Sequence, residues 1–157
     1  MSLRRSLEKF DDHVIHLLRR ISMPVARCAL FVVFFWFGVL KLLGISPANP
    51  LVSSLLEQTM PFMTFTTFIG LFAVYEMVIG VVFLIPRLER LAVALLIPHM
   101  LMTAMPLFLL TSMTWQGLFV PTLEGQYIIK NLVIIALAIG MASHLTPFHH
   151  GLSRRSK

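Results

Sequence analysis

Four long apolar stretches dominate the sequence, and each is long enough to cross a lipid bilayer as a helix. At about 1.5 Å per residue, about 20 apolar residues span the hydrocarbon core. Only 13% of the 157 residues are charged, and the mean hydropathy is +0.85. A soluble domain carries about twice that share of charge. The sequence therefore predicts an all-α, multi-pass integral membrane protein, a four-helix bundle with spans at about 24–45, 64–86, 91–111 and 126–145.

Basic residues indicate how the four spans are oriented. Eleven of the 13 Lys and Arg residues lie before the first span or in its first turn, in the turn between spans two and three, or after span four. Cytoplasmic segments are enriched in Lys and Arg, so the positive-inside rule places these segments and both termini in the cytoplasm. Residues 146–157 then form a basic cytoplasmic tail. The net charge of +6 is explained by membrane orientation, and no nucleic-acid partner is expected.

Two shorter amphipathic segments accompany the first span. In residues 1–23, apolar side chains recur at three- and four-residue spacing, as in an amphipathic helix. These side chains are Leu7, Phe10, Val14, Leu17, Leu18 and Ile21. The basic end of this helix predicts that it lies on the inner leaflet. A second such stretch, at 50–58 in the first outer loop, has Pro50 at a helix start and Asn49 as a candidate cap, and it would form a lid.

Ionisable side chains inside the predicted spans are the main candidates for function, because such groups are rare in membranes and face the bundle interior. They are Lys41, Glu76, His99 and Lys130. Glu76 and His99 fall at similar depth, and both lysines lie one to two turns nearer the outer face. A contact between Glu76 and a lysine or His99 would lower the energy of its burial. We expect Glu76 and His99 to be catalytic, proton-carrying residues, with both lysines holding an anionic or oxygen-bearing head group.

Polar and aromatic residues near the outer ends of spans one and four complete the candidate ligand site. Tyr127 and Asn131 are four residues apart on span four, beside Lys130. Glu124 lies at the outer mouth, and Trp36 lies on span one. Simpler explanations stay open. The lysines would snorkel to the outer interface, and the two mid-span residues would only clamp helices together.

The cysteine, histidine and methionine residues limit the cofactors. The single cysteine, Cys28, allows no intrachain disulfide and no multi-thiolate metal site. His99 is the only mid-span histidine, which disfavours a haem with two histidine ligands. Methionines in and after span three suggest Cu(I), which thioethers bind. These are Met100, Met102, Met105 and Met113. Their spacing does not align them on one helix face, so apolar filling is the favoured interpretation and no metal site is predicted.

Three stretches carry a resemblance to a known family. WFGVLKLLGISPANPLV (36–52), LFAVYEMVIGVVFLIPRLERLAV (71–93) and LEGQYIIKNLVIIALAIG (123–140) resemble the DoxX-like membrane proteins. They look closest to the branch that includes the reactive-chlorine-resistance inner-membrane proteins. The resemblance covers residues 25–145. The matching positions are Trp36, Gly38, Lys41, Glu76, Arg87, Gly125, Tyr127 and Lys130.

This resemblance implies a four-helix bundle of the bacterial inner membrane. Members are linked to quinone-coupled oxidation of thiosulfate, or accompany oxidoreductases in oxidative-stress defence. A quinone as ligand and an oxidoreductase as partner protein are therefore what the resemblance implies. The first outer loop of this chain is short, so any family feature housed in a longer loop is absent, and the lone cysteine argues against autonomous thiol chemistry.

The leading functional hypothesis is a redox-associated membrane subunit. It would bind a quinone or a similar small lipophilic or anionic molecule in an outward-facing intramembrane pocket. One alternative is a small proton-coupled transporter or exporter, which with four helices would act as a homo-oligomer. Another is a non-catalytic assembly or anchoring subunit. The sequence does not decide whether the chain is an enzyme by itself.

Overall fold

The structure, a computed structural model, describes residues 2–143 and residue 145. The tail predicted at 146–157 lies outside these residues. The elements, in chain order, are α1 (Ser2–Leu42), α2 (Asn49–Thr59), α3 (Phe65–Leu84), α4 (Glu89–Ala104), α5 (Pro106–Leu109), α6 (Thr111–Thr114), β1 (Trp115–Gly117), β2 (Val120–Pro121) and α7 (Leu123–Ala142).

In the described part of the chain, four helical segments are long and apolar enough to cross a membrane, which confirms the predicted number of spans. They are Leu7–Leu42, Phe65–Leu84, Glu89–Leu109 and Leu123–Ala142. The third runs from α4 into α5 because the backbone at Met105 stays helical (φ −52°, ψ −40°). The last three spans differ from the predicted boundaries by one to three residues at each end.

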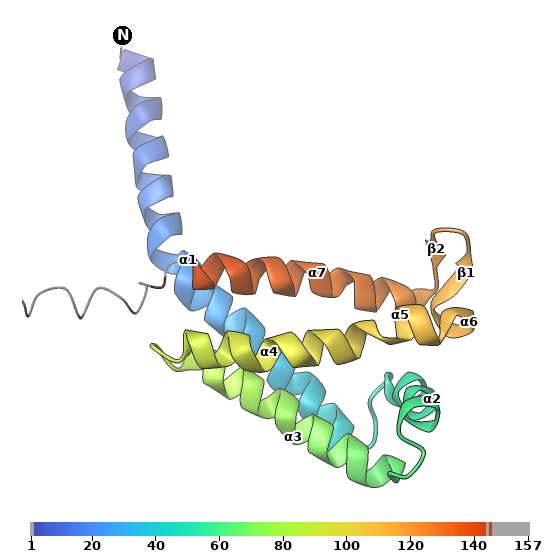
Figure 1. The fold of residues 1–157 in the computed structure, drawn as a ribbon. Coiled ribbons are helices and arrows are strands. Elements are labelled where there is room, and N and C mark those ends of the chain that lie inside the picture. The colour runs from blue at the N-terminus through green and yellow to red at the C-terminus, as the bar shows by residue number, and fades with distance from the viewer. Residues whose placement is uncertain (1, 144, 146–157) are drawn as a thin grey trace, which may run out of the picture.

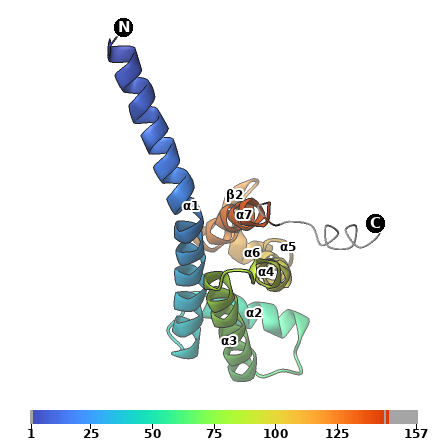
Figure 2. The same ribbon diagram turned by 90° about the vertical axis from the view of Figure 1, so that its left-hand side faces the viewer.

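The N-terminal segment and the first span form one continuous helix, whereas the sequence predicted a boundary between residues 23 and 24. Pro24 lies inside α1. A proline in a helix interior removes one backbone hydrogen bond, at a cost of about 3 kcal/mol, but the turns before and after it keep theirs. Figures 1 and 2 show the N-terminal half of α1 projecting away from the other helices.

The helices α1 and α3 run antiparallel and pack closely at two glycines, Gly38 on α1 and Gly80 on α3, each of which faces the backbone of the other helix. A Cβ atom on Gly38 would lie 2.8 Å from the carbonyl oxygen of Ala73, and one on Gly80 would lie 3.0 Å from the amide nitrogen of Phe35. Small residues allow transmembrane helices to pack backbone against backbone. Gly38 and Gly80 therefore allow the backbones of α1 and α3 to approach, whereas a Cβ atom on Gly70 or Gly140 would meet open space.

The helix α1 ends at Leu42, one residue after Lys41, and Gly44 forms its C-terminal cap. Gly44 has φ 74°, a left-handed conformation that L-residues with a side chain adopt at a cost. The amide of Ile45 donates to the carbonyl of Leu40 at 3.1 Å, and the amide of Gly44 donates to the carbonyl of Lys41 at 3.1 Å. This pair of bonds is a Schellman motif. It reverses the chain toward α2 and fixes Lys41 in the last turn of α1.

The short elements gather at one end of the bundle, here called the capped end. It is formed by α2, α5, α6, β1 and β2 (Figure 1). The helix α2 covers the predicted stretch 50–58, but its cap is Ala48, and Asn49 instead donates its side-chain amide to the carbonyl of Gly44 at 3.1 Å. The hairpin of β1 and β2 was not foreseen. The indole of Trp115 in β1 donates to the carbonyl of Leu107 at 3.0 Å.

The opposite end of the bundle, here called the Arg27 end, is closed by an ion pair and an apolar core. Arg27 on α1 pairs with Glu89, the first residue of α4, and also donates to the carbonyl of Phe83 at 3.3 Å. The core next to it draws on all four spans. Its most buried members are Leu30, Phe34, Ile79, Phe83, Ala92, Leu96, Ala138 and Met141. The polar cluster described below lies between this core and the capped end.

Candidate functional site

Lys41, Glu76 and His99 meet in the interior of the bundle. The ammonium of Lys41 donates to Oε2 of Glu76 at 2.6 Å, and Nε2 of His99 lies 3.0 Å from Oε1 of the same carboxylate. The three residues are 6%, 4% and 3% exposed, in that order. The structure therefore forms both contacts that were expected to lower the energy of burying Glu76. Three different spans, α1, α3 and α4, each contribute one residue to this cluster.

Helix direction explains why Lys41 points into the bundle. In an α-helix each Cα–Cβ bond tilts toward the helix N-terminus. The N-terminus of the membrane part of α1 lies at the Arg27 end, so Lys41 leans away from the capped end and into the interior. Because α3 runs the other way, Glu76 leans toward the capped end. The two side chains therefore lean toward each other, and their ion pair follows from the antiparallel packing of α1 and α3.

Two aromatic rings hold the imidazole of His99 in place. The ring of Phe72 stacks on it with centroids 5.1 Å apart and planes 7° apart, and the ring of Phe34 meets it edge-on at 5.2 Å and 79°. The ammonium of Lys41 lies 5.5 Å from the centroid of Phe72, within range of a cation–π interaction. Phe72 thus touches both His99 and Lys41. With these contacts, the imidazole has little freedom to rotate away from Glu76.

The hydrogen-bond network assigns the proton on His99. An ammonium only donates, so Oε2 of Glu76 accepts, and the ionised carboxylate accepts at Oε1 as well. Nε2 of His99 then carries the proton that it donates, and in the neutral imidazole Nδ1 carries a lone pair. Among the described residues, Nδ1 has no hydrogen-bond partner. A buried acceptor without a partner costs about 1–3 kcal/mol, and such atoms in native proteins call for an explanation in ligand binding or catalysis.

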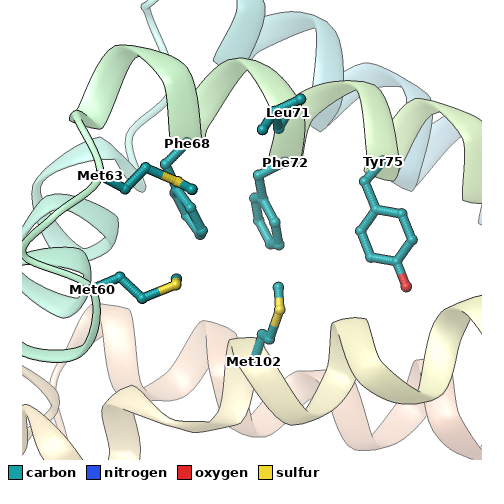
Figure 3. Close-up of a pocket in the computed structure, with 7 residues that line it drawn as sticks. All are labelled: Met60, Met63, Phe68, Leu71, Phe72, Tyr75 and Met102. Carbon is teal, nitrogen blue, oxygen red and sulfur yellow. The ribbon is translucent and has the colours of Figure 1, made fainter.

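An apolar cavity lies directly beside this cluster, between α3, α4 and the chain that leaves α2 (Figure 3). Its volume is about 240 Å³. Phe72 and Tyr75 form its wall toward the polar cluster, and Phe68 and Leu71 continue the wall along α3. The remaining lining residues are three methionines, Met60, Met63 and Met102. Phe72 therefore separates the ion-paired cluster from the cavity by the thickness of one ring.

The helix α2 forms one wall of a second cavity, of about 230 Å³. The two cavities adjoin, since Met60, Phe68 and Met102 line both. Val52, Leu55, Leu56 and Thr59 of α2 line the second one. The position of α2 over the space between α3 and α4 is that of a lid. Pockets for small ligands are mostly apolar with few polar groups, and their volumes begin at about 300 Å³, a size that two adjoining cavities reach.

The structure does not bring Lys130 to the buried cluster. Lys130 is exposed on α7, and its ammonium lies 5.4 Å from the ring centroid of Tyr127 one turn earlier. Because α7 begins at the capped end, the tilt of its Cα–Cβ bonds directs Lys130 toward that end. Lys41, in contrast, is buried and paired with Glu76. The expectation that the two lysines hold one head group between them is not supported by this arrangement.

The other expected ligand-binding residues are also separate from the cluster. Trp36 and Tyr127 are exposed, at 64% and 62%, and Glu124 is exposed at the start of α7. Asn131 is partly buried. The candidate site therefore lies on α1, α3 and α4, and α7 supplies none of the three clustered residues.

Phe72, Met60 and Met63 are site residues that were missed from the sequence. Phe72 precedes Glu76 by four residues on α3, so its place on the same helix face was a readable signal. Nothing in the sequence placed Met60 and Met63, because the loop between α2 and α3 has no periodicity. Met102 was considered only together with its neighbours on α4. The structure instead groups it with the two loop methionines, while Met100 is buried in the core.

The site contains no arrangement typical of metal ligation by acidic, imidazole or thiolate groups. Within residues 2–143 and 145, no three His, Cys, Asp or Glu side chains gather closely enough to hold a metal ion. The DoxX-like resemblance stays a prediction. Comparisons with family models, with curated proteins and with solved structures found no match for the chain.

Proposed function

We propose that this multi-pass membrane protein binds a small lipophilic molecule of the quinone class in the cavity between α2, α3 and α4. His99 exchanges a proton with the bound head group. The observation that carries the proposal is the partnerless Nδ1 of His99, which is buried one aromatic ring away from an apolar cavity. A hydroquinone in the cavity offers a hydroxyl donor to this lone pair once the ring of Phe72, which lies between the cavity and His99, turns aside. Its ring and tail suit apolar walls and thioethers.

The cluster supplies a proton site and no electrons. Oxidation of a hydroquinone releases two electrons and two protons. One hydroxyl proton can pass to Nδ1 of His99 while Glu76 accepts the hydrogen bond of Nε2–H and so orients the ring, and the second proton would leave to water at the capped end. The positive charge of Lys41 compensates the charge of Glu76, and Lys41 also lies over Phe72. The one cysteine of the chain gives no dithiol pair. An oxidoreductase partner would therefore provide or take the electrons.

The orientation of the protein is part of the same proposal. Arg27, Arg87 and Arg90 all lie at the Arg27 end, which the positive-inside rule assigns to the cytoplasm of a bacterial inner membrane. The capped end, with the lid helix α2, then faces outward. The N-terminal part of α1 would lie against the inner leaflet, since apolar residues such as Leu7, Phe10 and Leu17 are exposed along it and Arg19 and Arg20 make its end basic.

Two substitutions of His99 separate proton exchange from a purely structural clamp. A glutamine amide reaches the position of Nε2 and keeps a donor for Glu76, whereas an asparagine carbonyl occupies the position of Nδ1 and keeps the acceptor. We expect His99→Gln to weaken binding of a short-chain ubiquinol about tenfold, equivalent to about 1.4 kcal/mol. His99→Asn should retain tighter binding than His99→Gln. Titration calorimetry on purified protein in lipid nanodiscs measures both.

The thermal midpoint of each variant is the control for structure. If the cluster only clamps helices, His99→Gln keeps wild-type stability, His99→Asn loses stability, and neither changes ubiquinol binding. Wild-type affinity in His99→Gln would overturn the role of Nδ1. Failure of the wild-type protein to bind either ubiquinol or ubiquinone would overturn the quinone class as a whole.

A further inference from the structure

Three methionines that are far apart in the sequence present their thioethers to one cavity. Met60 and Met63 come from the chain between α2 and α3, and Met102 comes from α4. Figure 3 shows the ends of all three side chains extending into the same space beside the rings of Phe68 and Phe72. Each of the three is partly buried. The spacing of the three methionines along the sequence does not bring them together. They meet because the chain between α2 and α3 lies next to α4.

The donor atoms of this cavity are suited to a soft metal ion. Its lining has no carboxylate, imidazole or thiol, so a hard cation such as Mg²⁺ or Ca²⁺ finds no ligands there. Thioether sulfurs bind Cu(I) in preference to harder ions. Methionine also fills apolar space, but three thioethers around one cavity additionally provide a set of soft donor atoms that leucine would not. A Cu(I) site makes use of those donors.

The surrounding charges favour a monovalent ion. The nearest cation, Lys41, lies against the ring of Phe72, but Glu76 neutralises it at 2.6 Å. The cavity thus faces no net charge from the cluster. Burying a charge in apolar surroundings is costly, so a metal ion with a single positive charge is favoured over one with two. The rings of Phe68 and Phe72 stack with centroids 5.7 Å apart and planes 12° apart. Aromatic faces attract cations and exclude water, which also protects Cu(I).

We propose that Met60, Met63 and Met102 form a Cu(I)-binding site between α3, α4 and the chain that leaves α2. The site does not depend on the quinone proposal, although both occupants use the same cavity and would exclude each other. Met105 lines the adjoining cavity and lies on the route between α2 and α5. It would be a transient ligand for an ion that enters from the capped end.

The test is Cu(I) binding to the purified full-length chain in detergent under anaerobic conditions, measured by competition with a chromophoric Cu(I) chelator. All proteins carry Cys28→Ser, because the exposed thiol of Cys28 would bind Cu(I) by itself. We expect one Cu(I) per chain and an X-ray absorption spectrum with sulfur neighbours only. The variant Met60→Leu/Met63→Leu/Met102→Leu should bind at least 100-fold more weakly.

A matched triple variant is the control. Met23→Leu/Met77→Leu/Met113→Leu removes three thioethers outside the cavity and should keep wild-type Cu(I) affinity, since leucine and methionine have similar volumes. The proposal is overturned if wild type binds no Cu(I), if both triple variants lose affinity equally, or if nitrogen or oxygen ligands dominate the spectrum. Ubiquinol binding distinguishes the two proposals: it should survive the cavity leucines and fall in His99→Gln, whereas Cu(I) binding should do the reverse.

Discussion

Replacing Glu76 by leucine is expected to destabilise the folded bundle by about 3–5 kcal/mol, because it leaves the buried ammonium of Lys41 without its counter-charge. It also leaves Nε2–H of His99 without an acceptor. The free energy of unfolding in mixed micelles, followed by circular dichroism, measures the loss. A thermal midpoint of the purified variant gives the same ranking where unfolding is not reversible.

A second substitution shows that the loss comes from an unpaired charge. The double variant Glu76→Leu/Lys41→Met removes both charges and fills the space with apolar atoms. Replacing a buried ion pair by apolar groups is often neutral or stabilising. We expect the double variant to lose less than half of what the single variant loses. Glu124→Gln, at an exposed carboxylate, should change stability by less than about 0.5 kcal/mol. If the double variant loses as much free energy of unfolding as Glu76→Leu and Lys41→Met lose together, the result would contradict a stabilising ion pair.

Gly38→Ala is expected to destabilise the protein by about 1–3 kcal/mol, the usual effect of overpacking. The new Cβ would lie 2.8 Å from the carbonyl oxygen of Ala73, which belongs to the backbone of α3 and cannot rotate away. The two helices must separate to admit it, and the Lys41–Glu76 pair, which joins the same two helices, would lengthen. Unfolding measurements should therefore show a lower stability for Gly38→Ala than for the wild type.

Gly70→Ala is the matched control, since it places the same methyl group on α3 with no atom within 4 Å. Alanine favours a helix over glycine by about 0.5–1 kcal/mol, so this variant should be as stable as the wild type or more stable. The opposite ranking of the two variants would show that α1 and α3 do not pack through Gly38.

The sequence predicted the spans well because the hydrophobic length that crosses a bilayer is the same for every helix. It also predicted that Glu76 would meet a lysine or His99, since the loops fix the depth of each residue. Depth alone treated Lys41 and Lys130 as equivalent. They differ because Lys41 lies on a buried face of α1 and Lys130 on an exposed face of α7, and because α1 and α7 run in opposite directions, so that only Lys41 leans away from the capped end.

The cavity could not be predicted, for a different physical reason. Its walls combine one face of α3, one residue of α4 and two methionines from a loop, and the course of that loop depends on how α2 packs. Hydrophobic periodicity carries no information on such packing. The hairpin of β1 and β2 was missed because its strands have only three and two residues. Alternation cannot be recognised over so few positions.

The pairing of one ammonium with one carboxylate has an electrical consequence. With Lys41 and Glu76 paired as ions and His99 neutral, as the proposed function requires, the cluster carries no net charge, so a voltage across the membrane exerts no net force on it. Once a proton reaches Nδ1 of His99, the cluster carries a single positive charge inside the electric field. A full crossing of that field corresponds to about 2.3 kcal/mol per charge and 100 mV. Occupancy of the proton site, and with it the affinity for a hydroquinone, should therefore follow the membrane potential.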